Sequence, residues 1–193
     1  MFKDLVYQNR SFRRLDEGYA ITRETLVELV DLARCSASTG NRQALKFMLS
    51  YEAEKNAQMF PCIHLARRDR EVRHPPEGER PTAYIIILGD KEIAQNFAPD
   101  HGIAAQTIML GAREKGLGGT MVGMVRRDKL MEILNIPLRY QVLLVLALGK
   151  PKEEVRLEGL REDGGTAFWW DDAGVFHVPK RSLDDIIVAS FGT

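Results

Sequence analysis

The sequence predicts one domain in which helices and strands are mixed, of either the α+β or the α/β class. Its 193 residues suffice for one domain of ordinary size, and 45% of them are hydrophobic, so the chain can bury a substantial core. Segments with helical periodicity are interspersed with short strand-like segments, at about five helices and four strands. Periodicity alone does not choose between the two classes.

The first predicted helix covers residues 22–34, TRETLVELVDLAR. Thr22 is of a type that caps a helix N-terminus, and Glu24 suits the first turn. The apolar positions share one face of this helix: Leu26, Val30 and Ala33. The small and turn-forming residues CSASTGN then end the helix.

Three longer strands are expected. LKFMLSYE, residues 45–52, alternates in polarity, which predicts a strand with one face more buried than the other. TAYIIILGD, residues 82–90, is a continuous apolar run, typical of a strand buried on both faces. YQVLLVLALG, residues 140–149, is the most apolar run and is predicted to be a central strand.

Three further helices are expected between these strands. Residues 53–60 form a short one, and residues 127–135 another. The strongest pattern is DHGIAAQTIMLGAREK, residues 100–115, with Asp100 as its expected cap. Gly116 stands where a helix-ending glycine belongs.

The remaining segments are more polar. Residues 67–81 are charged and contain prolines, which predicts an exposed loop. AFWWDDAGVFHVP predicts two short strands around a DDAG turn. Residues 183–191 suit a terminal helix or a strand.

Composition excludes several classes of function. The 27 basic and 27 acidic residues cancel, which argues against nucleic acid or an anionic membrane as a partner. Cys35 and Cys62 have no CxxC spacing and no cluster with the histidines, so we expect no metal site and no disulfide framework. The polar N-terminus and the absence of a run of ~20 apolar residues predict a reduced, cytoplasmic protein.

Arginines surround one serine in NRSFRRLD, residues 9–16. Arg10, Ser11 and Arg13 offer forked donors and a hydroxyl, the groups that suit a phosphate monoester. The alternative is a solvated helix end in which Arg14 pairs with Asp16 or Glu17.

A polar loop, STGNRQ, covers residues 38–43. The amides of Asn41 and Gln43 combine donors with an acceptor, which suits the edge of a heterocycle. The alternative is a polar loop whose amides cap Gly40 and its neighbours.

The glycine-rich stretch GLGGTMVG, residues 116–123, is not a dinucleotide-binding fingerprint, because the glycines follow a helix and have the wrong spacing. We expect them to end the helix and to let backbone approach a flat group. The alternative is a plain helix-to-loop transition.

Lys180 and Arg181 form a second basic pair, which either completes an anion site or is solvated. The four histidines are scattered, and no serine or cysteine has the context of a nucleophile. Trp169 and Trp170 are typical of core or interface positions. No catalytic side chain is therefore predicted.

The order of these motifs resembles the FMN-dependent nitroreductase family. An RSxR element, a helix, a loop ending in NxQ and a strand come first, followed by a DxGxAAQ helix running into GLGG. VLLVLALGKPKE resembles the buried strand of that family, and FWWDDAGVFHVPKRSLDDII the tail of one of its branches. The resemblance extends from Asn9 to about Ile187.

The resemblance assigns roles around the phosphate of FMN. Arg10, Ser11 and Arg13 match the element that holds the ribityl phosphate and the flavin edge. Lys180 and Arg181 match the basic position near the same phosphate. Cations from both ends of the chain are thus expected to meet at one anion.

The resemblance also assigns roles around the flavin ring. Ser38, Asn41 and Gln43 match the loop that meets the isoalloxazine ring and the ribityl chain. Gly123 matches the glycine whose backbone N–H approaches the flavin N5. The resemblance implies that residues 1–193 form a single FMN-binding domain of α+β fold, with a central mixed or antiparallel sheet flanked by helices.

The implied activity is electron transfer from NAD(P)H through FMN to a nitroaromatic, a quinone or a similar electron-poor acceptor, with ping-pong kinetics. Alternatives are reductive dehalogenation, enone reduction, or a flavin-binding store or sensor without turnover. A plain interaction domain with solvated basic residues is the alternative that needs no flavin. Members of the family are homodimers with exchanged tails and two flavins at the interface, each built from both subunits.

Overall fold

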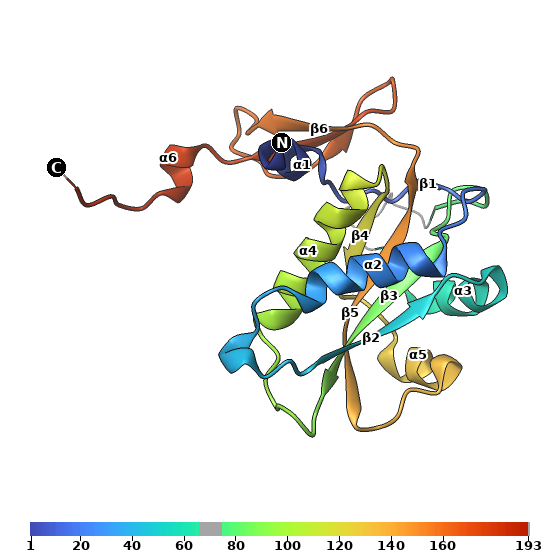
Figure 1. Cartoon of the computed structure of the whole chain (residues 1–193). Helices are drawn as coiled ribbons and strands as arrows, with labels where there is room; N and C mark the ends of the chain where they lie inside the picture. Colours follow the sequence, from blue (N-terminus) through green and yellow to red (C-terminus); the bar gives the residue numbers. More distant parts are fainter. Residues whose placement is uncertain (66–74, 193) are drawn as a thin grey trace. The chain divides into compact units, whose positions relative to one another are not determined.

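A computed structural model of the chain describes residues 1–65 and 75–192 (Figure 1). The chain divides into two compact units, Met1–Lys152 and Glu153–Thr193. A five-stranded sheet lies in the first unit and a three-stranded sheet in the second. The first part of the predicted loop 67–81 lies outside the described residues.

The strands of the large sheet pair antiparallel throughout, and β5 (Tyr140–Pro151) lies at the centre. One edge of β5 pairs with β3 (Ala83–Asp90), which pairs in turn with β2 (Leu45–Ser50). The other edge pairs with β4 (Gly118–Val122) and, further along, with β1 (Leu15–Asp16). The α+β class with a central antiparallel sheet is confirmed, and so are the three longer predicted strands.

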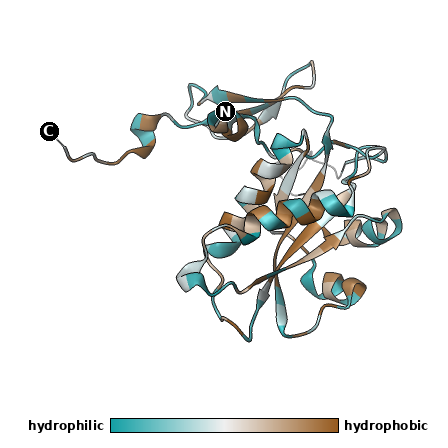
Figure 2. Cartoon of the chain, in the orientation of Figure 1, coloured by the Kyte–Doolittle hydropathy of each residue, from teal (hydrophilic) through white to brown (hydrophobic). Residues whose placement is uncertain are grey.

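Helices cover both faces of this sheet. α2 (Arg23–Arg34) and α4 (Asp100–Glu114) share one hydrophobic core with alternate residues of β3 and β5. α3 (Ala53–Met59) and α5 (Arg127–Leu134) share a second core with the opposite face of the same strands. Since both faces are covered, β3 is buried along its whole length, as its continuous apolar run predicted. The apolar character of these central strands is visible in Figure 2.

The predicted ends of two helices are confirmed. The Thr22 hydroxyl accepts a hydrogen bond from the Thr25 N–H at 3.3 Å and caps α2. Beyond the C-terminal end of α4, Gly116 adopts a φ of +73°, and Leu117 N donates to Ala112 O at 2.9 Å. A left-handed residue is needed for this helix stop, and glycine adopts that conformation without strain.

The expected cap of α4 was wrong. Asp100 is the first helical residue, and Pro99 is the cap position. The carboxylate of Asp100 instead accepts hydrogen bonds from Thr39, in a loop far away in the sequence. A capping preference read from local sequence does not reveal such a competing partner.

The plain helix-to-loop alternative for residues 116–123 is also wrong, because this stretch contains β4. A Cβ on Gly119 would lie 1.9 Å from the carbonyl oxygen of Ala147 in β5, and one on Gly118 would lie 2.6 Å from the Phe12 ring. At these two positions the glycines let the backbone approach other parts of the protein. Pairing of a glycine-rich strand is a long-range effect that periodicity does not detect.

The second unit contains β6 (Val155–Gly159), β7 (Trp169–Trp170) and β8 (Phe176–Lys180). β7 and β8 pair antiparallel, which confirms the two strands predicted around the DDAG turn. β6 pairs with β8 in parallel and was not predicted, because the segment around it is mostly polar. The helix α6 covers only Leu183–Ile186, the first part of the predicted terminal segment.

His177 joins these strands through polar and ring contacts. Its ring nitrogens lie 3.1 Å from Asp171 Oδ2 and 2.8 Å from Glu158 Oε1. The carboxylate of Asp171, followed by that of Glu158, raises the pKa of His177. The ring also stacks on Trp169, at 4.9 Å between centroids. His177 is therefore structural, as its sequence context indicated.

The remaining short elements of the described residues are α1 (Phe2–Gln8), η1 (Thr39–Asn41) and η2 (Phe60–Cys62). Within residues 1–65 and 75–192, no helix combines the length and apolar character that a membrane span requires. The same residues contain no group of three His, Cys, Asp or Glu side chains arranged to hold a metal ion.

Candidate functional site

The N-terminal arm runs alongside β4 and orients the predicted phosphate-binding residues. Ser11 forms a parallel bridge with Gly119, and Phe12 N donates to Gly119 O at 2.8 Å. Phe12 is buried, whereas Ser11 is exposed and Arg13 is half-buried. One apolar anchor therefore fixes the polar residues on either side of it.

Arg10 carries an unused donor in a protected position. Its Nη2 donates to the Val6 carbonyl at 2.7 Å, whereas its Nε is buried and has no hydrogen-bond partner in the described part of the chain. Burial lowers the pKa of this guanidinium, which nevertheless remains charged at neutral pH because arginine titrates far above it. A buried cationic donor without an acceptor suits an anionic ligand.

Arg13 and Gly123 line the same hollow, of about 80 Å³. Arg13 Nη1 also donates to Ser11 O at 3.3 Å, which holds the side chain against the arm. A Cβ on Gly123 would meet nothing within 4 Å, so the backbone there borders open space. The structure thus unites two residues that the sequence places far apart.

His64 and Met124 border this hollow too, and neither was predicted. The His64 N–H donates to Met124 O at 3.0 Å, beside the bridge between Ile63 and Val125. This pairing brings the segment after η2 to the end of β4. No local pattern in the sequence indicates it.

The solvated alternative for the arginine cluster named the wrong partner for Arg14. Its Nε lies 3.4 Å from Glu79 Oε2, in the described part of the predicted 67–81 loop. The acidic residues next to it bond elsewhere, since Asp16 accepts from the Gly18 N–H and Glu17 from the Gly78 N–H. The ion pair of Arg14 with Glu79 therefore holds the N-terminal arm in place, and this ion pair involves neither Arg10 nor Arg13.

The loop at residues 38–43 has an unusual backbone. Gly40, Asn41 and Gln43 have φ values of +57°, +52° and +51°. The left-handed region costs a residue with a Cβ roughly 1–2 kcal/mol, although Asn tolerates it better than most. Strain of this kind concentrates at functional sites, where the surrounding structure holds it in place.

A buried carboxylate holds this loop. Asp100 is 6% exposed, and its oxygens accept from the Thr39 N–H at 3.0 and 3.1 Å and from the Thr39 hydroxyl at 2.6 Å. Within the loop, Gln43 N donates to Ser38 Oγ at 3.3 Å, and Gln43 Nε2 lies 3.4 Å from Asn41 O. Ser38 and Gln43 border a hollow of about 390 Å³. The hydrogen bonds of Gln43 within the loop agree with the polar-loop alternative, but that alternative does not account for the strained backbone.

The two groups of predicted residues lie at opposite edges of the sheet. We call Arg10, Ser11, Arg13 and Gly123 the arginine edge, and residues 38–43 the amide loop. The arginine edge borders β4, the amide loop leads into β2, and both β5 and β3 lie between them. Three inter-strand spacings of about 4.8 Å amount to about 14 Å. One chain therefore does not bring the two groups together.

Lys180 and Arg181 belong to the second unit. Lys180 ends β8, Arg181 follows it, and both side chains are exposed. Their expected meeting with Arg10 and Arg13 stays a prediction.

Comparisons with known proteins agree with this fold. A family model described as the nitroreductase family matches residues 6–150. A protein of Archaeoglobus fulgidus, named as a candidate NADH dehydrogenase or NAD(P)H nitroreductase, is 25% identical over 158 residues, which span 78% of this chain and 85% of the relative.

Two solved structures are similar as well. An FMN-dependent nitroreductase from Clostridium difficile R20291 is 24% identical, with a TM-score of 0.63 over 78% of this chain and 87% of the other. A candidate nitroreductase from Exiguobacterium sibiricum 255-15, solved in complex with FMN, is 19% identical, with a TM-score of 0.68 over 79% of this chain and 89% of the other. At these identities the solved structures show the fold alone.

Proposed function

Because the chain belongs to the nitroreductase family and is an oxidoreductase, we propose that it passes two electrons from NAD(P)H to a nitroaromatic, quinone or similar electron-poor acceptor. FMN is its cofactor, as in related proteins of this fold. When bound, FMN takes a hydride from the nicotinamide and later delivers two electrons to the acceptor, so the two substrates use one pocket in turn with ping-pong kinetics.

The observation that carries the proposal is the shared hollow of Arg13 and Gly123, beside the buried donor of Arg10. A phosphate monoester offers this donor the acceptor that the described part of the chain does not. The open backbone at Gly123 gives a flat ring room to approach. The residues of the arginine edge therefore fit the phosphate and the ring edge of FMN.

The chain's own task is positioning and electrostatics. Arg10, Ser11 and Arg13 bind the phosphate, and the Gly123 N–H steadies the ring. Asn41 and Gln43 contribute amide donors and acceptors to the ring or to the ribityl chain. No side chain needs to act as a general acid or base, and water supplies the proton.

The separation of the two groups supports a homodimer that shares its FMN sites, and the resemblance to the family implies that the tails are exchanged. The arginine edge of one subunit and the amide loop of the other form each FMN site, with Lys180 and Arg181 joining at the phosphate. In this assembly residues 1–193 act as a single FMN-binding domain. We expect this dimer to work in the cytoplasm.

The visible absorption spectrum of the fresh protein tests the proposal first. We expect flavin bands that bleach when NADH or NADPH is added without oxygen, and that return when a nitroarene or a quinone is added. Bands that never bleach indicate a flavin store or sensor. Bleaching without turnover of either acceptor redirects the search to enones and halogenated aromatics.

Mixed dimers test the shared site. We expect a dimer of one Arg13→Ala subunit and one Asn41→Ala subunit to contain one intact FMN site and one doubly altered site. If each site belonged to a single chain, both sites would carry one substitution and neither would be intact. Half of the wild-type FMN content and activity in the mixed dimer supports the first arrangement, and uniform loss contradicts it.

A further inference from the structure

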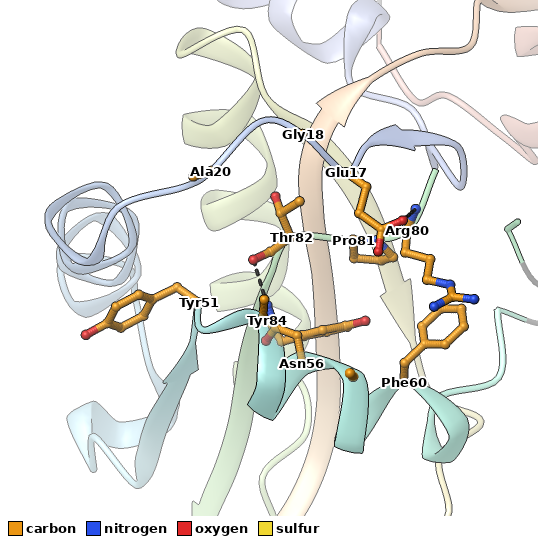
Figure 3. Close-up of a pocket in the computed structure, with 12 residues that line it drawn as sticks. Glu17, Gly18, Ala20, Tyr51, Asn56, Phe60, Arg80, Pro81, Thr82 and Tyr84 are labelled. Carbon is orange, nitrogen blue, oxygen red and sulfur yellow. Dashed lines mark hydrogen bonds between the residues drawn. The ribbon is translucent and has the colours of Figure 1, made fainter. Parts of the chain in front are cut away.

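A third hollow, of about 170 Å³, lies between α3, the start of β3 and the segment around Glu17 (Figure 3). None of the residues that line it belongs to the arginine edge or to the amide loop. Much of the lining is apolar: Ala20, Ala53, Ala57, Phe60 and Pro81. A concave apolar site with a few polar groups is the usual form of a small-molecule site.

Two buried donors in this hollow have no partner among the residues that the structure describes. Arg80 stacks its guanidinium over the Phe60 ring at 5.1 Å, and its Nε is buried without a hydrogen-bond partner among these residues. Thr82 Oγ1 is likewise buried and without a partner there. Buried polar atoms are satisfied in the great majority of cases, so two such atoms around one hollow suit a ligand that carries acceptors.

Tyr84 supplies a third polar group. The residue is 1% exposed, and Figure 3 shows its ring along the hollow with the hydroxyl turned towards Phe60. The hydroxyl forms no hydrogen bond within the residues that the structure describes. Burial raises the pKa of Tyr84 far above neutral pH, so the hydroxyl keeps its proton and can donate it.

Two acceptors of the same hollow already have partners. Asn56 Oδ1 accepts from the Ser50 hydroxyl at 2.7 Å, and Asn56 Nδ2 donates to Thr82 O at 2.7 Å. Glu17 Oε2 accepts from the N–H groups of Gly78 and Arg80, at 2.5 and 3.4 Å. The described residues thus give Arg80 Nε and Thr82 Oγ1 no acceptor, which favours a ligand that offers acceptors.

We propose that this hollow binds a small aromatic carboxylate, whose oxygens meet Arg80 and Tyr84 and whose ring lies along Phe60. A guanidinium fork matches a carboxylate with two parallel hydrogen bonds. The volume equals about six waters at their liquid share of about 30 Å³, enough for one six-membered ring and a carboxylate. This site is independent of the proposed function.

This site and the arginine edge lie at different strands of the sheet. Tyr84 of β3 pairs with Ala147 of β5, which pairs on its other side with Thr120 of β4, in the hollow of Arg13. Two inter-strand spacings, about 10 Å, lie between the two hollows on the same face of the sheet. Binding in one can therefore be measured while the other is followed separately.

Calorimetric titration of the flavin-loaded protein with benzoate tests the site. We expect benzoate to bind, and benzamide, its neutral isostere, to bind at least tenfold more weakly because it lacks the charge that Arg80 recognises. Arg80→Gln should weaken benzoate at least tenfold without changing the binding of benzamide. Equal affinity of wild type and variant for benzoate would overturn the proposal.

Two further variants serve as matched tests and guard against a folding defect in the first. Tyr84→Phe removes only a hydroxyl and should weaken benzoate by about threefold. Glu17→Gln keeps an acceptor for the backbone N–H groups but removes a negative charge near the ligand, so it should tighten benzoate by about threefold. Thermal unfolding of each variant verifies the fold, and a Glu17→Gln protein that binds benzoate more weakly contradicts the proposal.

The flavin spectrum distinguishes this site from the pocket over FMN. Benzoate in the third hollow should leave the visible flavin bands unchanged and should not compete with NAD(P)H. If benzoate perturbs these bands and binds to wild type and Arg80→Gln with equal affinity, the compound binds at the flavin and the site at Arg80 is excluded. A protein without flavin that still binds benzoate through Arg80 would contradict the proposed function and leave this inference intact.

Discussion

The arginine edge and the amide loop represent two ways of placing polar groups. The arginine edge depends on pairing between distant segments, since the N-terminal arm, β4 and β5 are held together by hydrogen bonds and by glycines that permit close approach. The amide loop depends on a strained local backbone that one buried carboxylate holds in place. A substitution that disrupts strand pairing should therefore disrupt the arginine edge together with the sheet. A substitution that releases the amide loop should leave the sheet intact.

The arginine edge and the amide loop lie at opposite edges of the sheet, which bears on how an FMN site could be assembled. The width of the sheet keeps them apart in one chain. In the homodimer that we propose, a second copy of the chain brings its own amide loop to its neighbour's arginine edge. In that proposal the fold is stable in the single chain, and FMN binding requires the pair.

Gly119→Val should have the largest effect. The added side chain has no room beside the carbonyl of Ala147, so β4 must leave β5 and the arm must lose its bridge. We expect the free energy of unfolding to fall by about 3 kcal/mol or more, measured by urea denaturation.

Gly123→Ala is the matched control for that change, four residues further along the same edge. Its Cβ would meet nothing within 4 Å, so the free energy of unfolding should stay within about 0.5 kcal/mol of wild type. Equal destabilisation by the two substitutions would contradict the role given to close backbone approach.

Arg13→Ala should leave the fold intact and weaken FMN by about 100-fold, because a charge-assisted contact with a phosphate is worth about 2–3 kcal/mol. Riboflavin has no phosphate and should lose little affinity. Fluorescence titration of the apoprotein with both flavins measures the difference.

The double substitution of Lys180→Ala and Arg181→Ala applies the same test to the second unit. If these cations reach the phosphate, the affinity for FMN should fall much more than the affinity for riboflavin. Equal loss for both flavins would argue against a phosphate role.

Asp100→Ala should release the amide loop and leave the arginine edge in place. Removing the carboxylate leaves the Thr39 N–H and hydroxyl without their acceptor, which should cost about 2 kcal/mol of unfolding free energy. Hydrogen exchange at the Thr39 amide should become much faster. Asp100→Asn keeps one acceptor oxygen and should show a smaller change. Identical exchange rates at the Thr39 amide in wild type and Asp100→Ala would show that Asp100 does not hold the loop.

Gln43→Gly should have the smallest effect on stability, with the opposite sign. Relief of the left-handed backbone outweighs the extra chain entropy, for a gain of about 0.5 kcal/mol. Gln43→Ala keeps the strain and should show no gain, although both variants lose the amide and should bind FMN more weakly. A stability gain with alanine as well would show that the strain is not the cause.

Much of the fold could be predicted from local patterns. The apolar face and the Thr22 cap gave α2, the continuous apolar run gave β3, and Gly116 gave the end of α4. In each case the signal and the structure lie within the same few residues. The types of residue in the candidate site were also visible, since arginines and amides stand out in any context.

The partners of those residues were not visible. GGTMV has no strand periodicity and became β4 only through pairing with β5, and β6, within a mostly polar segment, became a strand only through β8. Asp100 was expected to cap its own helix, yet it binds Thr39. The donors left over at Arg80 and Thr82 likewise appear only when the acceptors around them are counted in space.

The sequence by itself thus determined the helices α2 to α5, the central strands and the chemistry that the side chains offer, because hydrophobic periodicity and residue type are local properties. Only the tertiary structure decided that Arg13 and Gly123 share a hollow, that the amide loop lies at the opposite edge, and that two donors without acceptors among the described residues border a third hollow. These arrangements depend on strand pairing between segments far apart in the chain, and the energy of such pairing is set by the partner as much as by the segment itself.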